Sequence, residues 1–259
     1  MIDAFNRTWR VFGTGLSFFV FGLTGLILGV LVFPALQLLV SNGARRQQLA
    51  RAINHFTFRQ FVRLMNGLGL LRYDLVGFDR LERRGLLILA NHPSLIDTVF
   101  LLGFVRHSNC VVNGQLFRNP FTSGQLRAAG YIRSDSGVAI VDDCVAALEA
   151  GDNVLIFPEG TRTPLDGEIH LRRGAANIAV RGGRDVTPIV IRCTPRTLSK
   201  GEKWWRVPPR RVQITLEVCN DIPVQPFLEA AAEPALAVRD LTAHLERYFT
   251  RESRPHAVV

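Results

Sequence analysis

The feature that most constrains this chain is a long uncharged segment near its amino terminus. Residues 11–44 contain no Asp, Glu, Lys or Arg, and most of them are apolar. A membrane span needs about 20 apolar residues, so the segment is longer than a straight helix across a hydrocarbon core of about 30 Å requires. It also exceeds the apolar region of a secretory signal peptide and has no small-residue cleavage site of the usual form. We therefore expect residues 1–43 to be a membrane anchor.

Two arrangements of this anchor are compatible with the sequence. One is a single tilted span with frayed ends. The other is a helical hairpin that enters and leaves on the same face, bending at residues 22–25 or at Pro34. Arginines flank the segment on both sides, and basic residues favour the cytoplasmic side of a membrane. This pattern favours the hairpin, and in either arrangement it places the rest of the chain on the cytoplasmic side. The flanking arginines are Arg7, Arg10, Arg45, Arg46, Arg51, Arg59 and Arg63.

Residues 44–71 mix apolar positions with arginines in the manner of a basic amphipathic helix. Such a helix can lie at the membrane surface with its arginines near lipid phosphates. It can equally be an ordinary helix packed on the domain that follows. A second basic and aromatic stretch, residues 204–211, is expected to be a loop, either near the membrane or in solvent.

Residues 72–259 alternate short apolar runs with helical stretches. This alternation predicts an α/β domain with a mixed, largely parallel central sheet flanked by helices. Strands are expected at residues 73–76, 86–90, 110–112, 154–157, 187–192 and 212–218, and helices at residues 93–104, 138–150, 174–181 and 234–250.

The charge and cysteine content narrow the partners. The chain has 31 Lys and Arg against 22 Asp and Glu, a net charge of +9, which suits an anionic partner such as a nucleic acid, an anionic membrane or a phosphorylated substrate. The four cysteines form no C-x-x-C pair, and the six histidines are scattered. We expect reduced thiols in a cytosol-facing domain and no metal site.

The first polar cluster is Asn-His-Pro-Ser-Leu-Ile-Asp at residues 91–97, directly after an apolar strand. Pro93 suits the first turn of a helix and forces His92 into an extended conformation. His92 should therefore lie at the strand-to-helix corner, with Asp97 about one turn into the helix, so that the two can approach each other. A carboxylate bonded to one imidazole nitrogen leaves the other free as a base. The exposed amides at the helix start can stabilise an anion. The alternative is a purely structural hydrogen bond.

The second polar cluster is Phe-Pro-Glu-Gly-Thr-Arg at residues 157–162, again at the end of a buried apolar strand. Gly160 lets the backbone approach a ligand closely. Arg162 offers a planar fork suited to a phosphate or carboxylate. Glu159 can order that arginine or bind a hydroxyl group. The alternative is a turn with a surface Glu-Arg pair.

These two clusters resemble the first and third motifs of the glycerolipid acyltransferase family, which includes the 1-acylglycerol-3-phosphate acyltransferases. Their order and separation agree with that family, and residues 186–191 resemble its fourth motif. The resemblance covers residues 73–218. It implies that His92 is the general base, that Asp97 orients it, and that residues 159–162 bind the glycerol-phosphate end of the acceptor. The substrate-binding residues that it implies are Asn91, Ser94, Glu159, Gly160, Thr161, Arg162 and Arg133.

The second motif departs from the family pattern. Asn113 stands where the family often has Lys, Gln115 where it has Glu, and Ser136 where it has a downstream Arg, with Arg133 displaced by three positions. The loss of charged contacts leaves two interpretations. Either the acceptor is less phosphorylated, or other arginines make those contacts, the candidates being Arg118, Arg133, Arg172 and Arg173.

The resemblance thus implies a membrane-bound enzyme that transfers a fatty acyl group from acyl-CoA or acyl carrier protein to the hydroxyl of a lysophospholipid such as 1-acylglycerol 3-phosphate. It implies no metal, no cofactor and no nucleic acid partner. Three alternatives stay open: an acyltransferase for an amino-acid or specialised lipid, a thioester or lipid hydrolase, and a catalytically silent membrane-binding module. The donor, the acyl chain length and the oligomeric state are open as well.

Overall fold

A mixed seven-stranded sheet forms the centre of the computed structural model, which describes residues 2–137, 139–164 and 166–254. The strand order is β1-β7-β6-β2-β5-β3-β4. All neighbouring pairs are parallel except β6 with β7, so the predicted largely parallel sheet is confirmed. The strands are β1 (Leu71–Val76), β2 (Leu87–Ala90), β3 (Ser108–Val112), β4 (Ile132–Arg133), β5 (Asn153–Ile156), β6 (Val186–Thr194) and β7 (Val212–Val218).

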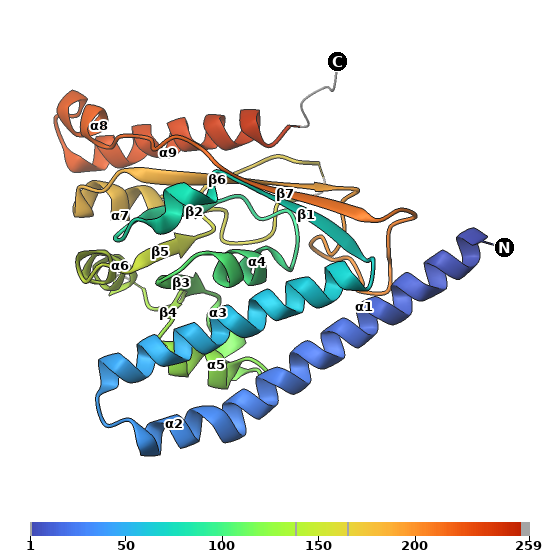
Figure 1. Cartoon of the computed structure of the whole chain (residues 1–259). Coiled ribbons are helices and arrows are strands. Elements are labelled where there is room, and N and C mark those ends of the chain that lie inside the picture. Colours follow the sequence, from blue (N-terminus) through green and yellow to red (C-terminus); the bar gives the residue numbers. More distant parts are fainter. Residues whose placement is uncertain (1, 138, 165, 255–259) are drawn as a thin grey trace.

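Helices cover both faces of this sheet, and a separate apolar core lies under each face (Figure 1). Strands β2 and β5 are buried along their whole length, as expected for strands covered on both faces. One face carries α3 (Gly43–Gly67), α4 (Asp97–Phe104) and α5 (Ser123–Ala129); the other carries α6 (Ala139–Glu149), α7 (Gly174–Gly182), α8 (Gln225–Ala230) and α9 (Pro234–Glu252).

Most of the predicted elements lie within two residues of the observed ones. Strand β4 and helices α5 and α8 were not predicted, because two to seven residues carry too little periodicity to be recognised. The expected start of α6 at Val138 lies outside the described residues. The expected helix at residues 93–104 was wrong at its beginning, since α4 starts only at Asp97.

The turn before α4 explains that difference. The carboxylate Oδ2 of Asp97 accepts a hydrogen bond from the backbone N–H of Ser94 (2.7 Å), as the acidic residue of a capping box does. This bond holds residues 93–96 in a turn, so Pro93 lies ahead of the helix rather than in its first turn. Asp97 is therefore the first helical residue and lies closer to His92 than one turn of helix would allow.

The amino-terminal segment is one continuous rod rather than a folded hairpin. Helix α1 (Ile2–Ile27) passes through a π-helical turn (Leu28–Val32) into α2 (Phe33–Leu39). Pro34 lies at the start of α2 just after this turn, where its missing N–H is tolerated. Both expected bends, at residues 22–25 and at Pro34, were wrong.

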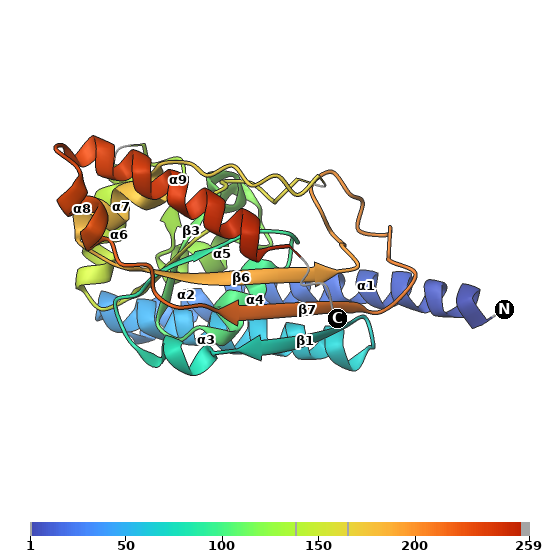
Figure 2. The same ribbon diagram turned by 90° about the horizontal axis from the view of Figure 1, so that it is seen from above.

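The chain reverses at residues 40–42 instead, near the end of the uncharged segment. Asn42 caps the next helix there, since its Oδ1 accepts from the N–H of Arg45 (3.0 Å). Helix α3 then runs back beside α1, as Figures 1 and 2 both show. The 34 residues Asn6–Leu39 form the one helix in the described part of the chain that is long and apolar enough to cross a membrane.

Glycines let the amino-terminal rod lie close against the α/β domain. A Cβ atom on Gly25 would overlap the carbonyl oxygen of Phe121, and one on Gly29 would lie 3.4 Å from the Cα of Gly124. A larger residue at Gly25 would push the helix off the domain, whereas Gly29 lies in ordinary contact with Gly124. The opposite face of the rod is apolar and exposed, and it carries Phe12, Leu16, Phe19, Leu23, Leu26, Ile27, Val30, Leu31, Leu38 and Leu39.

Helix α3 packs on the domain and directs two of its arginines into it. Arg51 donates to the carbonyl of Ala129 (2.8 Å) and forms an ion pair with Asp152 (2.6 Å). Arg59 donates to the carbonyl of Gly103 (3.1 Å). These two side chains are therefore directed at the domain, as the packed-helix interpretation expects.

Candidate active site

The register of two neighbouring strands brings the two polar clusters together. Strands β2 and β5 are parallel and adjacent, and Leu89 pairs with Ile156. The residues that follow these two strands therefore leave the sheet at the same edge and in the same direction. In α/β sheets this carboxyl edge is where ligands bind. His92 and Glu159, which are 67 positions apart in the chain, meet at this edge.

His92 and Asp97 form a hydrogen-bonded pair across the turn. Nδ1 of His92 lies 2.9 Å from Oδ2 of Asp97. The Asp97 side chain is fully buried, whereas 15% of the His92 side chain is exposed. The imidazole stacks on the ring of Phe157 with 4.1 Å between centroids, which restricts its orientation. With Asp97 ionised, Nδ1 carries the proton and donates it to Asp97, so Nε2 has a free lone pair.

The electrostatics of Asp97 combine two opposing effects. Burial raises the pKa of the Asp97 carboxyl, because a charge is poorly solvated there. The hydrogen bonds from His92 and from the Ser94 N–H act in the opposite direction and favour the carboxylate. The hydrogen bond from His92 therefore favours the charged form of Asp97, and the same bond fixes the orientation of the His92 imidazole.

Glu159 is turned inward and holds the backbone of His92. Its Oε1 accepts from the N–H of His92 (2.9 Å) and from the hydroxyl of Thr163 (2.8 Å). The N–H of Thr163 in turn donates to the carbonyl oxygen of His92 (2.7 Å). Glu159 is only 5% exposed, and burial raises the pKa of its carboxyl. We call Glu159 and Thr163 the histidine clamp. They fix both backbone groups of the residue that carries the imidazole.

Thr163 is a site residue that the sequence did not identify. It lies one position beyond the recognised cluster, and a threonine in a polar loop carries no signal of its own. Its role follows only from its hydrogen bonds to Glu159 and to His92. The position of Glu159 differs from the sequence-based expectation as well, since the carboxylate faces the histidine loop rather than an incoming hydroxyl group.

Asn91 and Ser94 are buried beside the pair and do not face solvent. The Asn91 side chain donates to the carbonyl of Ile191 (2.8 Å) and accepts from its N–H (2.7 Å), so it joins the end of β2 to β6. The backbone of Ser94 is held by Asp97. Both residues shape the loop that carries His92.

Arg162 also points inward. Its Nη1 donates to the carbonyls of Leu198 (2.7 Å) and Ser199 (2.9 Å), which ties the site to the loop after β6. The carbonyl of Leu198 accepts from the N–H of Leu95 at the same time. Arg162 therefore links this loop to the histidine turn, and the fork that the sequence suggested for an anion is partly occupied by backbone oxygens.

Arg133 lies away from the His92 pair. Strand β4 is separated from β2 by β5 and β3, which at about 4.8 Å per strand spacing corresponds to roughly 14 Å. Its guanidinium is paired with Asp135 through two hydrogen bonds of 3.0 and 2.8 Å and is over the ring of Phe117. The structure therefore does not bring Arg133 together with His92 and Glu159.

A different arginine lies over the second cluster. Gly160 has a φ of +66°, and a Cβ atom there would lie 2.6 Å from Nε of Arg172. The backbone N–H of Arg172 donates to the carbonyl of Pro158 (2.8 Å). Arg172 is exposed, and its guanidinium has no hydrogen bond or ion pair to any residue that the structure describes. Thr161 is half-buried next to it.

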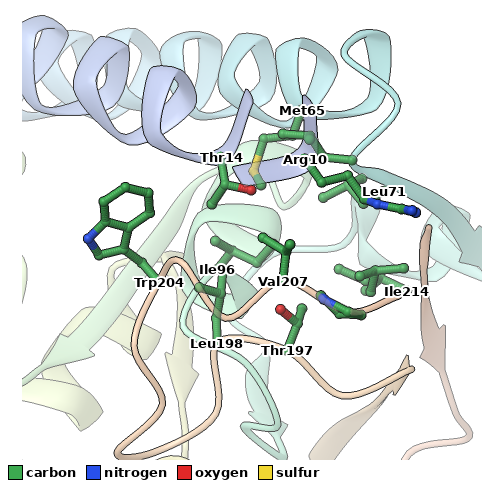
Figure 3. A pocket seen from close by; sticks show the side chains of 13 residues that line it. Arg10, Thr14, Met65, Leu71, Ile96, Thr197, Leu198, Trp204, Val207 and Ile214 are labelled. Atoms are coloured by element: carbon green, nitrogen blue, oxygen red, sulfur yellow. The ribbon is translucent and has the colours of Figure 1, made fainter. Parts of the chain in front are cut away.

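An apolar cavity lies behind the histidine turn, between α1, the end of α3 and the sheet (Figure 3). It is small, with a cavity volume of about 30 Å³. Ile96 and Leu198 form its wall toward the site. Met65, Trp204, Val207 and Ile214 line the remainder, with Arg10 and Thr14 contributed by α1. The site thus combines a base at a polar edge with an apolar space on the other side of the same turn.

Comparisons with known proteins show what the chain is similar to. Residues 72–192 match the family model described as Acyltransferase. The chain is similar to the 1-acyl-sn-glycerol-3-phosphate acyltransferase of Pseudomonas aeruginosa, with 28% identity over 193 residues that cover 70% of this chain and 68% of that protein. It is 28% identical over 171 residues to the enzyme of the same name from Saccharomyces cerevisiae, covering 60% of this chain and 53% of that relative.

The crystal structure of the 1-acyl-sn-glycerophosphate (LPA) acyltransferase PlsC from Thermotoga maritima is similar in fold. The TM-score is 0.69 at 19% sequence identity, and the match covers 98% of this chain and 100% of that chain. At this level of identity the likeness shows that the fold is shared, including the amino-terminal helices.

Proposed function

We propose that this chain is a member of the glycerolipid acyltransferase family and that it transfers a fatty acyl group from acyl-CoA or acyl carrier protein to the hydroxyl of 1-acylglycerol 3-phosphate. The observation that carries this proposal is the pair of His92 and Asp97, at 2.9 Å, with the imidazole partly exposed at the carboxyl edge of the sheet. The relatives named above, which are 1-acyl-sn-glycerol-3-phosphate acyltransferases, support the choice of acceptor.

The proposed reaction is a direct transfer. Nε2 of His92 takes the proton from the acceptor hydroxyl while the oxygen attacks the thioester carbonyl. The new C–O ester bond forms, the C–S bond breaks, and the imidazolium returns its proton to the leaving thiolate. Asp97 holds the imidazole in the tautomer that this requires and stabilises the imidazolium. General-base assistance of this kind contributes about 100- to 10,000-fold to the rate.

Two of the amides after Pro93, which the sequence suggested as oxyanion donors, already have partners. The N–H of Ser94 already donates to Asp97, and that of Leu95 donates to the carbonyl of Leu198 (3.2 Å). Pro93 itself has no N–H. We assign no oxyanion donor to this turn.

A transfer assay separates the proposal from its rivals. Purified protein in mixed micelles is incubated with a radiolabelled acyl donor, either acyl-CoA or acylated acyl carrier protein. The acceptor is lysophosphatidic acid, monoacylglycerol or lysophosphatidylcholine. The products are resolved by thin-layer chromatography. We expect phosphatidic acid as the main product. Free fatty acid as the main product in the presence of acceptor would instead identify a hydrolase. Saturable transfer to another lipid, without transfer to lysophosphatidic acid, would identify a different acceptor.

Arg172 is the residue that we propose for the acceptor phosphate. The departures in the second motif remove charged contacts, Arg133 is paired with Asp135, and Arg162 is bonded to backbone carbonyls. Arg172 lies over Gly160, next to the clamp residue Glu159, and its guanidinium is available. A charge-assisted hydrogen bond to a phosphate is also stronger than a neutral one.

Substitution Arg172→Gln is expected to raise the KM for lysophosphatidic acid about 10- to 100-fold, because a hydrogen bond to a charged group is lost. Transfer to monoacylglycerol, which has no phosphate, should change by less than about twofold. The matched control is Arg173→Gln at the neighbouring exposed arginine. Equal effects of both substitutions, or an unchanged KM in Arg172→Gln, would show that Arg172 does not bind the phosphate.

The amino-terminal rod, we propose further, lies in one leaflet instead of crossing the bilayer. One face of the rod is docked on the domain from Gly13, beside Leu70, to Gly29, beside Gly124, while the opposite face is apolar and exposed. A helix perpendicular to the membrane would draw the attached domain into the hydrocarbon, where its polar surface is costly. A helix lying along the interface buries the exposed apolar face and keeps the site next to its lipid substrate. The flanking arginines support the cytoplasmic leaflet.

A further inference from the structure

The three tryptophans of the chain lie around the amino-terminal part of α1. Trp9 is on α1 itself, and its Nε1 donates to the carbonyl of Leu68 (2.9 Å). Trp204 packs against the same helix, since a Cβ atom on Gly15 would be 3.1 Å from its ring, and Figure 3 shows the indole beside α1. Trp205 stacks edge-on against Trp204, with 5.6 Å between centroids. All three side chains are between 43% and 48% exposed.

The loop between β6 and β7 that carries two of these tryptophans is fixed in place. Arg10 of α1 donates to the carbonyl of Pro209 (2.7 Å). At the end of the loop, Arg211 donates to the carbonyls of Leu71 (2.8 Å) and Asn66 (2.8 Å). These bonds tie the loop to both α1 and the end of α3. Because the loop is held at both places, its two indoles are kept exposed by the folded structure itself.

The exposed charged side chains around the indoles are all positive. Lys200, Lys203, Arg206 and Arg210 are all exposed on this loop, and Nζ of Lys203 lies 5.1 Å from the centre of the Trp205 ring. The acidic residue of the loop, Glu202, is half-buried and accepts from the N–H of Ser199 (3.0 Å). Indoles with a basic surround match the headgroup region of an anionic bilayer, where the ring lies at the interface and the cations meet lipid phosphates.

The position of the indoles relative to α1 identifies the bilayer, instead of another protein, as the partner. The exposed apolar face of the rod begins at Phe12, one turn after Trp9, and continues to Leu39. The tryptophans therefore lie where this apolar face meets the polar surface of the domain. When the apolar face of the rod is inserted in a membrane, Trp204 and Trp205 therefore lie at the same depth as the end of that face.

We propose that the loop of residues 199–211 is a second membrane contact, which places Trp204 and Trp205 among the headgroups of an anionic bilayer. This inference rests on the membrane-bound function proposed above. It has a consequence for the active site, because the carbonyls of Leu198 and Ser199, at the start of the loop, bind Arg162. Trp204 also lines the apolar cavity behind the histidine turn. The membrane contact thus lies at the mouth of that cavity.

Intrinsic fluorescence tests this proposal directly. In the variant Trp9→Phe, the emission comes only from the two loop tryptophans. Vesicles of phosphatidylcholine and phosphatidylglycerol are prepared with bromine on the acyl chain, either near the carbonyl end or near the methyl end. We expect a blue shift and quenching on addition of vesicles, stronger with the shallow bromine. Unchanged emission with both lipids, while the protein sediments with the vesicles through α1, would overturn the proposal.

A second variant measures the contribution to binding. Trp205→Ala should weaken sedimentation with anionic vesicles about tenfold, as the loss of a half-buried indole predicts. The control Leu236→Ala removes an exposed apolar side chain from α9, on the opposite face of the sheet, and should leave binding unchanged. Equal effects of the two substitutions would contradict a specific contact. Quenching without acyl transfer would refute the proposed function alone, and acyl transfer without quenching would refute the loop contact alone.

Discussion

The variant His92→Ala is expected to transfer acyl groups about 100- to 10,000-fold more slowly than the wild-type chain, because the acceptor hydroxyl loses its base. The structure gives the reason for assigning this effect to one nitrogen. Nδ1 is engaged with Asp97 at 2.9 Å, so the lone pair of Nε2 is the one that can accept the proton. The measurement is the initial rate of phosphatidic acid formation at saturating concentrations of both substrates.

A loss of activity supports this role only if the fold persists. Removing the imidazole leaves the buried carboxylate of Asp97 without its partner, so circular dichroism and the Tm must be compared with the wild type. His170→Ala is the matched control, because the His170 side chain is 75% exposed and has no structural role in the turn that carries His92. Activity of His92→Ala within a few-fold of the wild type, in a folded protein, would rule out His92 as the base.

The variant Thr163→Val should lower kcat about 10- to 100-fold and leave the KM values of both substrates nearly unchanged. Valine has the shape of threonine but lacks the hydroxyl that donates to Glu159 (2.8 Å), so one bond of the histidine clamp is lost. The backbone of His92 can then move, and a displacement of about 1 Å of a catalytic group can cost about 100-fold in rate. Steady-state kinetics with lysophosphatidic acid measure both parameters.

A conservative rescue distinguishes positioning from substrate binding. Thr163→Ser restores the hydroxyl and should recover most of kcat. If Glu159 instead bound the acceptor, as the sequence alone suggested, freeing its carboxylate would alter the KM for lysophosphatidic acid. A change in that KM with kcat retained would therefore contradict the histidine clamp.

The sheet and the position of the base could be predicted because both depend on local signals. Strands β2 and β5 are short apolar runs that end at polar residues, and this pattern is visible in the chain itself. Pro93 marks the corner after β2, so the meeting of His92 with Asp97 could be inferred from six consecutive residues. These signals do not depend on distant parts of the chain.

The directions of the polar side chains could not be predicted in the same way. Glu159, Asn91 and Arg162 look like exposed ligands in the sequence, yet each is bonded to a backbone group contributed by a distant segment. The partners of Asn91 and Arg162, Ile191 and Leu198, belong to β6 and to the loop that follows it. Sequence spacing carries no information about which backbone atoms a long-range contact will supply.

The sequence by itself determined the α/β class, the apolar amino-terminal segment and the location of a histidine base beside a carboxylate. Local periodicity and the restricted dihedral angles around Pro93 are sufficient for those features. Only the tertiary structure decided that the apolar segment is one rod docked through Gly25 and Gly29, and that Glu159 holds His92 rather than facing solvent. Those features depend on packing and on hydrogen bonds between residues far apart in the chain, which become defined only when the strands assemble in register.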